Sequence, residues 1–357
     1  MTKARKYIYD ENLCAHFHAI SRIVQGGFLM GFDEKSGINY DHRLDWVQDR
    51  LKELSAIFTL VIGSHSVLHS HFHISLQTRP DLTAELTDRE VAQRFFKLCP
   101  PKQSKKRILT PAEWTFLEDE LIANEKLIKE YRKRIGSLSW FMKFLKEPIA
   151  RRANKESNKK GHFWDSRFKS ILWIGNEAVI LGQIYVDLNP IRAGIADTPE
   201  NSKFTGAYVR IQANEAVKKL AEIKELELNG HEIHDDKKKE IEETSKLIGS
   251  ANWLAPFYQG ESHIRPFIKI TENDYFELLD NVARELHPGK KGYMDPTLDS
   301  IFDRLKIDRE QWLDAIKNYD KWFYRIVGKM STAWDALKDT TTQWFKGSKN
   351  NRRLFGD

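Results

Sequence analysis

Residues 57–76 read IFTLVIGSHSVLHSHFHISL, and two β-prone runs within this stretch decide the fold. Residues 57–62 are rich in β-branched and large apolar side chains, whereas residues 66–76 alternate between apolar and polar positions. Gly63 and Ser64, between the two runs, have the composition of a turn. Such runs and such alternation are typical of strands, so the stretch predicts a β-hairpin.

Three histidines occupy every second position of the second predicted strand. His69, His71 and His73 should share one face of the sheet, because successive side chains of a strand point to opposite faces. Neighbouring imidazoles on a stiff strand could hold a divalent cation against a phosphate. His16 and His18 repeat the pattern in an earlier strand. We interpret that pair as coincidental, or else as flanking the site from the neighbouring strand.

The segments around the hairpin complete a ferredoxin-like arrangement. Residues 13–24 alternate as a strand, and residues 41–54 have the apolar spacing of a helix. With the hairpin they form half of a βαββαβ pattern. Residues 162–173 read as a further strand, and residues 177–188 as a helix that Pro190 stops. We therefore predict an α+β fold, with a ferredoxin-like antiparallel sheet and flanking helices.

The rest of the chain predicts mainly helices. Residues 78–137 contain four prolines and mixed charged helices, which we interpret as a helical insertion in a domain of residues 1–200. Residues 201–262 are highly charged and predict a helical linker or arm. Residues 263–357 carry Trp and Phe at helical spacings and predict a separate C-terminal helical domain.

Composition excludes several classes of protein. The chain has 357 residues, 41% of them hydrophobic, and no apolar run long enough to span a bilayer or to form a signal peptide. The two cysteines, Cys14 and Cys99, exclude a disulfide framework and a thiolate zinc site. We expect a cytoplasmic protein in a reducing compartment.

Charge is concentrated in one segment. The net charge of the chain is only +6, but residues 142–170 alone hold nine basic and three acidic side chains. Trp164 and several phenylalanines lie among them, as expected where a groove follows a nucleic-acid backbone and stacks its bases. A solvated helix face followed by a basic loop would have the same composition.

A second chemical motif lies in the helix near residue 185. Residues 183–194 read QIYVDLNPIRAG. Tyr185 and Asn189 are one helical turn apart, so a phenol oxygen and an amide oxygen can face a common centre. Arg192 follows beside the helix end, where a phosphate is easily held. A surface tyrosine before an ordinary Asn-Pro helix stop is the alternative interpretation.

Three motifs together resemble one known family. SHFHI at residues 70–74, GHFWDSRFKS at 161–170 and YVDLNPIRAG at 185–194 resemble the REP-associated tyrosine transposases, single-tyrosine members of the HUH nuclease superfamily. The resemblance covers about residues 12–200, and its most specific element is the Tyr-x-x-x-Asn-Pro-x-Arg-Ala-Gly block. Ser70 stands where many relatives have Asn, which changes the surroundings of the first histidine of the pair.

The resemblance implies a fold and a mechanism. It implies an HUH nuclease fold in which His71, His73 and Asn189 hold one Mg²⁺ or Mn²⁺ ion. The ion would polarise a phosphate oxygen, and Tyr185 would attack the phosphorus to give a 5′-phosphotyrosine link and a free 3′-OH. Reversal by another 3′-OH rejoins strands without ATP. Mixed nitrogen and oxygen ligation does not choose between the two ions.

The resemblance also implies a partner, single-stranded DNA that carries a hairpin from a palindromic repeat. Residues 298–316 have the spacing of a helix-turn-helix, so the C-terminal domain is a candidate contact for the hairpin. The chain could act as a monomer or a homodimer. Accessory roles in deprotonating the phenol are open to His69, His162 and Lys169. Our candidate DNA contacts are Arg22, Arg151, Arg152, Lys159, Lys160, Trp164, Arg167, Lys169 and Arg192.

Two other functions remain open from the residues alone. One is a nucleic-acid-binding protein that descends from a transposase and no longer cleaves. The other is a hydrolytic nuclease in which His69, His71 and His73 form a three-histidine metal site and water replaces the tyrosine. Covalent protein–DNA adducts, free ends or no cleavage distinguish the three.

Overall fold

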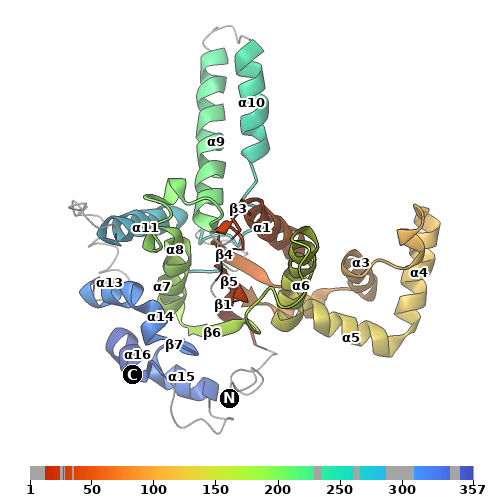
Figure 1. Cartoon of the computed structure of the whole chain (residues 1–357), viewed down its shortest axis with the longest axis horizontal. Helices are drawn as coiled ribbons and strands as arrows, with labels where there is room; N and C mark the ends of the chain where they lie inside the picture. Colours follow the sequence, from red (N-terminus) through yellow and green to blue (C-terminus); the bar gives the residue numbers. More distant parts are fainter. Residues whose placement is uncertain are drawn as a thin grey trace.

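The fold is of the α+β class, with a mixed five-stranded sheet and helices on both of its faces (Figure 1). No helix in the part of the chain that the structure describes is long and apolar enough to cross a membrane. The computed structural model describes residues 13–356 apart from residues 25–26, 28, 34–35, 229–234, 260–265, 287–308 and 338–345.

The strand order confirms the predicted ferredoxin-like arrangement. The sheet runs β4 (Val61–Val67), β5 (His71–Thr78), β1 (Ala15–Arg22), β6 (Lys169–Ile174) and β7 (Ile326–Gly328). The first four strands pair in antiparallel fashion, in the order of a βαββαβ unit. β7 pairs parallel with β6. The four strands of the predicted unit are antiparallel, and β7, which was not predicted, adds a parallel edge that makes the whole sheet mixed.

The β4–β5 hairpin turns later than predicted. β4 continues through Gly63 and Ser64, and its register with β5 shifts between Ile62 and Ser64. Gly63 serves close packing here, because a Cβ atom would lie 2.4 Å from the ring of Phe267. The turn falls at residues 68–70 instead. It thereby removes one of the three histidines from the strand.

The last strand of the ferredoxin-like unit is shorter than predicted. Residues 162–168 are irregular, and only the isolated bridge between Ile23 and Trp164 links them to the end of β1. The Trp164 ring packs edge-on against Phe72, and its Nε1 donates to the Lys146 carbonyl. These contacts keep residues 162–168 out of the strand pairing of the sheet, which begins at residue 169.

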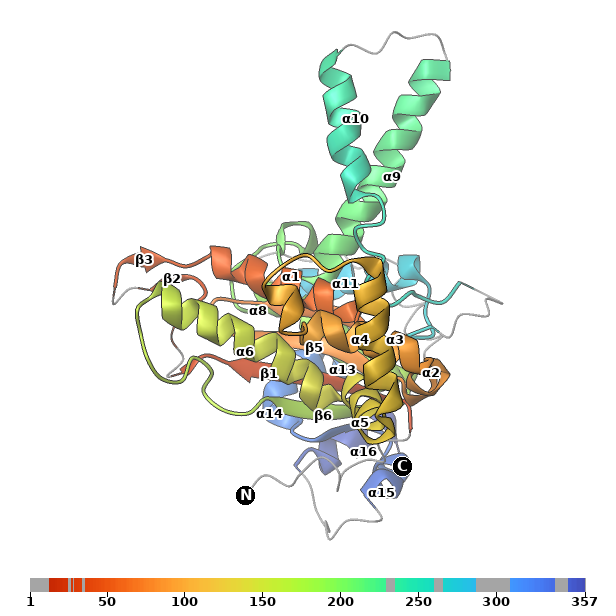
Figure 2. The ribbon, with the colours of Figure 1, turned by 90° about the vertical axis from the view of Figure 1, so that its right-hand side faces the viewer.

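Helices cover both faces of the sheet. α1 (His42–Ser55) and α6 (Leu138–Glu156) pack together over the face that carries Phe17 and Phe72 (Figure 2). α6 is continuous through Pro148. The opposite face of the sheet carries the histidines of β1 and β5, namely His16, His18, His71 and His73.

That opposite face is covered by α7 (Asn176–Asp187), which confirms the helix predicted there. Pro190 does not simply end the helical segment. It lies in the first turn of a short helix, α8 (Asn189–Arg192), where its missing N–H has no cost. A two-stranded ribbon of β2 (Phe32–Asp33) and β3 (Ile38–Asn39) precedes α1.

Residues 78–137 are largely helical, as predicted. Capping boxes at Thr87 and Thr110 begin two of the helices, and an apolar cluster of their own joins them. Their status as an insertion stays a prediction. The elements are α2 (Pro80–Glu85), α3 (Asp88–Leu98), η3 (Gln103–Lys105), α4 (Pro111–Ala123) and α5 (Glu125–Ile135).

The charged segment after residue 201 forms a helical pair. η4 (Pro199–Asn201) leads into α9 (Gly206–Leu228), which packs against α10 (Asp235–Leu247). The two helices project from the body of the molecule as an arm (Figure 1). The first turns of α9 are buried and contact β4, so the base of the arm is part of the central packing.

The C-terminal segment is not a separate, purely helical unit. Its β7 joins the sheet, and Trp312, Tyr319 and Phe323 share one apolar cluster with α7. The aromatic side chains at helical spacing pack against this cluster, not only against each other. Of the helix-turn-helix predicted at residues 298–316, only the part from residue 309 lies among the described residues. The described helices are α11 (Glu272–Leu286), α13 (Arg309–Lys317), α14 (Tyr319–Trp322), α15 (Met330–Leu337) and α16 (Ser348–Phe355).

Candidate active site

Two of the predicted histidines lie side by side at the start of β5. His71 is half-buried and His73 is 3% exposed, and their ring centroids are 4.9 Å apart. The register of the sheet places Arg22 directly opposite His71. The Ser70 hydroxyl lies 2.9 Å from Nδ1 of His71. Ser70 thus contacts the first histidine of the pair directly.

The third histidine does not belong to this pair. His69 lies in the hairpin turn, where its ring packs against Gly31 and its Nε2 lies 3.6 Å from the Asp41 carboxylate. No group of three or more His, Cys, Asp or Glu among the described residues is placed to hold a metal ion. The three-histidine interpretation was therefore wrong. His162, the other accessory candidate, is exposed in the loop before β6.

The tyrosine helix brings its two predicted groups to the same place. Tyr185 is 5% exposed, and its ring centroid lies 5.7 Å from that of His73. The Asn189 side chain acts on both groups, lowering the pKa of the Tyr185 phenol and raising that of the His71 imidazole. Tyr185 lies on α7 and Asn189 begins α8. The chain keeps a helical path across Leu188, so the two residues lie on the same side of the helical segment. The structure thus brings His71, His73, Tyr185 and Asn189 together.

A fifth residue was missed. His18, on β1, is fully buried, and its Nε2 lies 2.7 Å from Nδ1 of His73. The interpretation of the His16–His18 pattern as coincidental is wrong for His18, and the alternative of a flanking position is the one that the structure shows. His16 instead contacts the Phe267 carbonyl at 3.0 Å. The signal in the sequence was the shared spacing of the two histidine pairs.

Burial keeps the imidazoles neutral. It lowers the pKa of His71 to about 4, assisted by the charge of Arg22 and opposed by the hydrogen bond with Asn189. Burial lowers the pKa of His73 well below its usual value, and the nearby His18, His71, Arg22 and Arg192 act in the same direction. Neutral imidazole is the form that binds metal ions.

The tyrosine is held in its protonated form. Burial raises the pKa of the Tyr185 phenol above 10, while the charge of Arg192 and the hydrogen bond with Asn189 act in the opposite direction. The Arg192 guanidinium lies 4.4 Å from the centre of the Tyr185 ring. Arg192 is fixed in turn by a hydrogen bond to the Lys317 carbonyl.

Positive charge surrounds this centre. Burial, followed by the charges of Arg22 and Lys346, lowers the pKa of Lys169 to about 8. Lys169 and His73 both pair with Ile20 of β1, from opposite sides, so Lys169 and His73 lie on one face of the sheet. Cations grouped in this way are suited to hold a phosphate.

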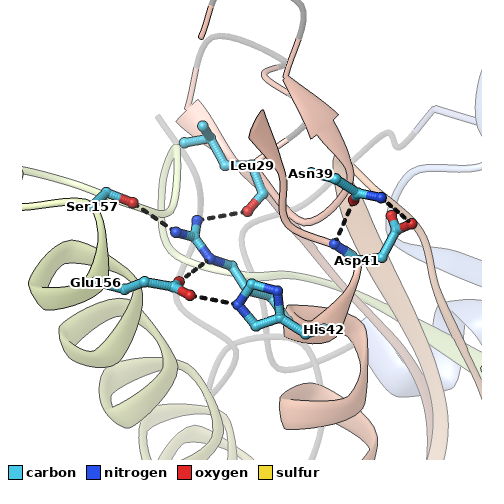
Figure 3. Close-up of polar contacts among 7 residues, drawn as sticks. Leu29, Asn39, Asp41, His42, Glu156 and Ser157 are labelled. Carbon is cyan, nitrogen blue, oxygen red and sulfur yellow. Dashed lines mark hydrogen bonds and ion pairs between the residues drawn. The ribbon is translucent and has the colours of Figure 1, made fainter. Parts of the chain in front are cut away.

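The basic segment lies beside the same end of the sheet. The backbone N–H of Asp165 donates to the Arg22 carbonyl, which ties the loop before β6 to the end of β1. Glu156, at the end of α6, bonds to His42 at 2.5 Å and to Arg43 (Figure 3). These bonds fix the end of the helix from which Arg151 and Arg152 project.

The predicted DNA contacts divide into exposed and buried groups. Arg151 is exposed and bonded to Glu147, and the Arg152 guanidinium lies 3.8 Å from the centre of the Trp46 ring. Trp164 was a wrong candidate, because it is only 9% exposed and its ring packs into the core between the sheet and α6. The exposed basic candidates are Arg22, Arg151, Arg152, Lys159, Lys160 and Arg167, while Lys169 and Arg192 are half-buried.

The donor atoms fit a divalent ion. Nε2 of His73 is buried and has no hydrogen-bond partner among the described residues, although a buried polar atom normally has one. Neutral imidazole nitrogen and amide oxygen are ligands compatible with Mn²⁺ or Mg²⁺. His71, His73 and Asn189 are therefore the residues that could hold the ion.

Comparison with solved structures finds a limited similarity. No family model matches the chain, and no curated protein matches it. A solved structure described as "Structure of the REP associates tyrosine transposase bound to a REP hairpin" aligns with 57% of this chain and 82% of its own. The identity is 11% and the TM-score is 0.33.

Proposed function

We propose that this chain is a metal-assisted enzyme that cleaves and rejoins single-stranded DNA through a covalent bond to Tyr185. The observation that carries the proposal is the convergence of one phenol, one amide and two neutral imidazoles on the same face of the sheet. His71 and His73 come from a strand, and Tyr185 and Asn189 come from the helices above it. Nothing in ordinary core packing requires this set of polar groups.

The protein groups suit an in-line attack on a phosphate. Arg22, Lys169 and Arg192 would hold the phosphate, and Asn189, which lowers the pKa of the Tyr185 phenol, would orient it. The phenol oxygen forms a bond to phosphorus, the bond from phosphorus to the 3′ oxygen breaks, and that oxygen leaves as a 3′-OH after taking up a proton. The phenol proton must be removed as the bond forms. A bound Mg²⁺ or Mn²⁺ ion would supply Lewis-acid polarisation of a phosphate oxygen.

The proposed substrate is single-stranded DNA next to a hairpin. The exposed basic groups at the end of α6 and in the loop before β6 are tied to the strand end that carries Arg22. A DNA backbone could therefore reach the phosphate site from this surface. A tyrosine on a packed helix cannot meet a phosphate in line within a regular duplex, so the strand at the cut must be unpaired.

One observation favours a second candidate, a protein that binds the hairpin without cleaving it. Tyr185 is 5% exposed in this structure, so the phenol must become accessible before it can attack. The same basic surface would serve a binding protein. Formation of a covalent adduct distinguishes the two functions.

The test uses the intact protein with a DNA hairpin that carries a single-stranded flank, in the presence of Mn²⁺. We expect a DNA-linked band on a denaturing gel, and peptide mapping should place the nucleotide on Tyr185. Tyr185→Phe removes the attacking oxygen and should bind the hairpin but form no adduct. Tyr258→Phe, at a tyrosine that is 42% exposed, is the matched control and should form it normally. An adduct that persists in Tyr185→Phe would contradict the proposal.

A further inference from the structure

We propose that His18 is a positioning residue that holds Nδ1 of His73 and thereby keeps Nε2 of His73 free to bind the metal ion. The inference rests on the proposed function, because His73 is one of its metal ligands. It concerns a residue on a different strand, β1, which contributes none of the proposed ligands.

The contact between the two imidazoles is specific. Nε2 of His18 lies 2.7 Å from Nδ1 of His73, and the rings stack with centroids 4.9 Å apart and planes 28° apart. His18 is 0% exposed and His73 is 3% exposed. A hydrogen bond between two buried side chains at this distance fixes the direction of both rings.

The hydrogen bond has two possible arrangements of its protons. Nδ1–H of His73 can donate to Nε2 of His18, or Nε2–H of His18 can donate to Nδ1 of His73. Only the first arrangement leaves a lone pair on Nε2 of His73, because a neutral imidazole carries one proton. His18 then carries its proton on Nδ1. Both arrangements hold the same number of protons, so metal binding selects between them without proton gain or loss at this pair.

The surroundings of His18 prevent it from leaving this position. Its ring centroid lies 5.6 Å from that of Trp173, 5.7 Å from that of Tyr185 and 5.8 Å from that of Tyr319. Trp173 donates its Nε1–H to the Tyr319 hydroxyl, so it does not compete for a nitrogen of His18. The backbone of His18 is held between β5 and β6. A rigid partner of this kind orients a metal-binding imidazole and fixes its tautomer.

This arrangement assigns different roles to two adjacent histidines. Nε2 of His18 is bonded to Nδ1 of His73, so it is not free to bind a metal ion. Nε2 of His73 is buried and without a partner among the described residues. Nδ1 of His18 also has no partner among the described residues, but in the first arrangement it carries the ring proton and has no free lone pair for a metal ion. His18 therefore acts through His73 and is not itself a metal ligand.

The first measurement is Mn²⁺ affinity in the absence of DNA, by electron paramagnetic resonance titration of the intact protein. His18→Leu removes the acceptor, and we expect its affinity to fall about 10–100-fold, as for other residues that support a metal ligand. His18→Gln offers an amide oxygen to Nδ1–H of His73 and should lose far less. His16→Gln, on the same strand, is the matched control and should bind Mn²⁺ like the wild type.

The second measurement reads the tautomer directly and needs no variant at His18. Long-range proton–nitrogen NMR correlations of protein labelled with ¹⁵N-histidine and loaded with diamagnetic Zn²⁺ should show the His73 proton on Nδ1. They should also show the His18 proton on Nδ1. His73→Ala assigns the His73 signals.

Several results would overturn the inference. They are an unchanged Mn²⁺ affinity in His18→Leu, a His73 proton on Nε2 in the loaded protein, or a nitrogen of His18 that itself binds the metal ion. Wild-type protein that binds no Mn²⁺ would overturn it as well. The proposed function can fail separately. A protein that binds Mn²⁺ through an oriented His73 but never forms an adduct would support the role of His18 and contradict the proposed cleavage activity.

Discussion

The ring of Tyr319 stacks on the ring of Tyr185, with centroids 4.2 Å apart and planes 26° apart. Tyr319 is fully buried on α14, and its hydroxyl accepts a hydrogen bond from Nε1 of Trp173 at 2.5 Å. Trp173 belongs to β6, so the stack links the proposed nucleophile to the sheet through a residue of the C-terminal segment. The position of the phenol depends on this distant segment.

We expect Tyr319→Leu to slow adduct formation by about 10–100-fold, because displacement of a reacting group by about 1 Å has effects of that size. Hairpin affinity should change little, since Tyr319 is buried away from the basic surface. Tyr319→Phe keeps the ring and loses only the bond to Trp173, so its rate should stay closer to that of the wild type. The rate of DNA-linked band formation measures both, and equal rates in Tyr319→Leu and wild type would contradict the role.

The parts of the fold that were predictable depend on local periodicity. The alternation of β1 and β5 and the helical spacing of α1 identify these segments as two strands and a helix. They were sufficient to indicate the βαββαβ succession of elements that a ferredoxin-like unit has. The same periodicity places His71 and His73 on one face, and Tyr185 near Asn189.

The parts that were missed depend on contacts between distant segments. The importance of His18 follows from the register of β1 with β5, which no local pattern reports. Gly63 resembled a turn residue, but its small size serves packing against Phe267. Trp164 resembled a stacking platform, but the position of α6 decides that it is covered. β7 is three residues long, too short for alternation to mark it as a strand.

Loss of either proposed histidine ligand should separate cleavage from binding. His71→Ala and His73→Ala should each reduce adduct formation below detection, because the phosphate loses its metal-assisted polarisation. Hairpin binding should stay within about threefold, since it depends on the exposed cations. His16→Ala should retain most of the activity. A mobility-shift assay beside the adduct gel checks both, and full activity of His71→Ala would show that the ligand pair is wrong.

DNA binding should depend steeply on salt and should prefer unpaired flanks. The exposed cations at the end of α6 and on β1 would displace counterions from phosphates, so log affinity should fall linearly with log salt concentration. Arg22→Ala or Arg152→Ala should reduce this slope by about one. Lys126→Ala, in the helical segment of residues 78–137, is the control and should leave the slope unchanged. Equal affinity for a blunt duplex of the same length would count against the proposed substrate.

A buried carboxyl group lies two residues after the proposed nucleophile. The Asp187 carboxyl accepts hydrogen bonds from the hydroxyls of Ser64 and Tyr275 and from the backbone N–H of Ala207. Burial raises the pKa of Asp187 to about 6, although these bonds and the charge of Arg210 act in the opposite direction. The residue joins the end of α7 to β4, α9 and α11, so its protonation state affects the framework of the site.

Stability should therefore fall as pH rises through the range in which folded Asp187 loses its proton. The unfolded carboxyl releases its proton near pH 4, whereas the folded one does so near pH 6. Between these values the native state binds more protons than the unfolded state, so the free energy of unfolding decreases with rising pH. The decrease should approach about 3 kcal/mol at the 1.36 kcal/mol that one pKa unit represents.

Asp187→Asn carries no titrating group, and subtracting its unfolding free energy at each pH from that of the wild type isolates this contribution from other carboxylates. Urea denaturation of both proteins from pH 4 to pH 7 measures this difference. The unfolding free energy of the wild type minus that of Asp187→Asn should decrease progressively as the pH rises. A difference that is constant with pH, or that shifts in favour of the wild type, would show that Asp187 is ionised without penalty in the folded protein.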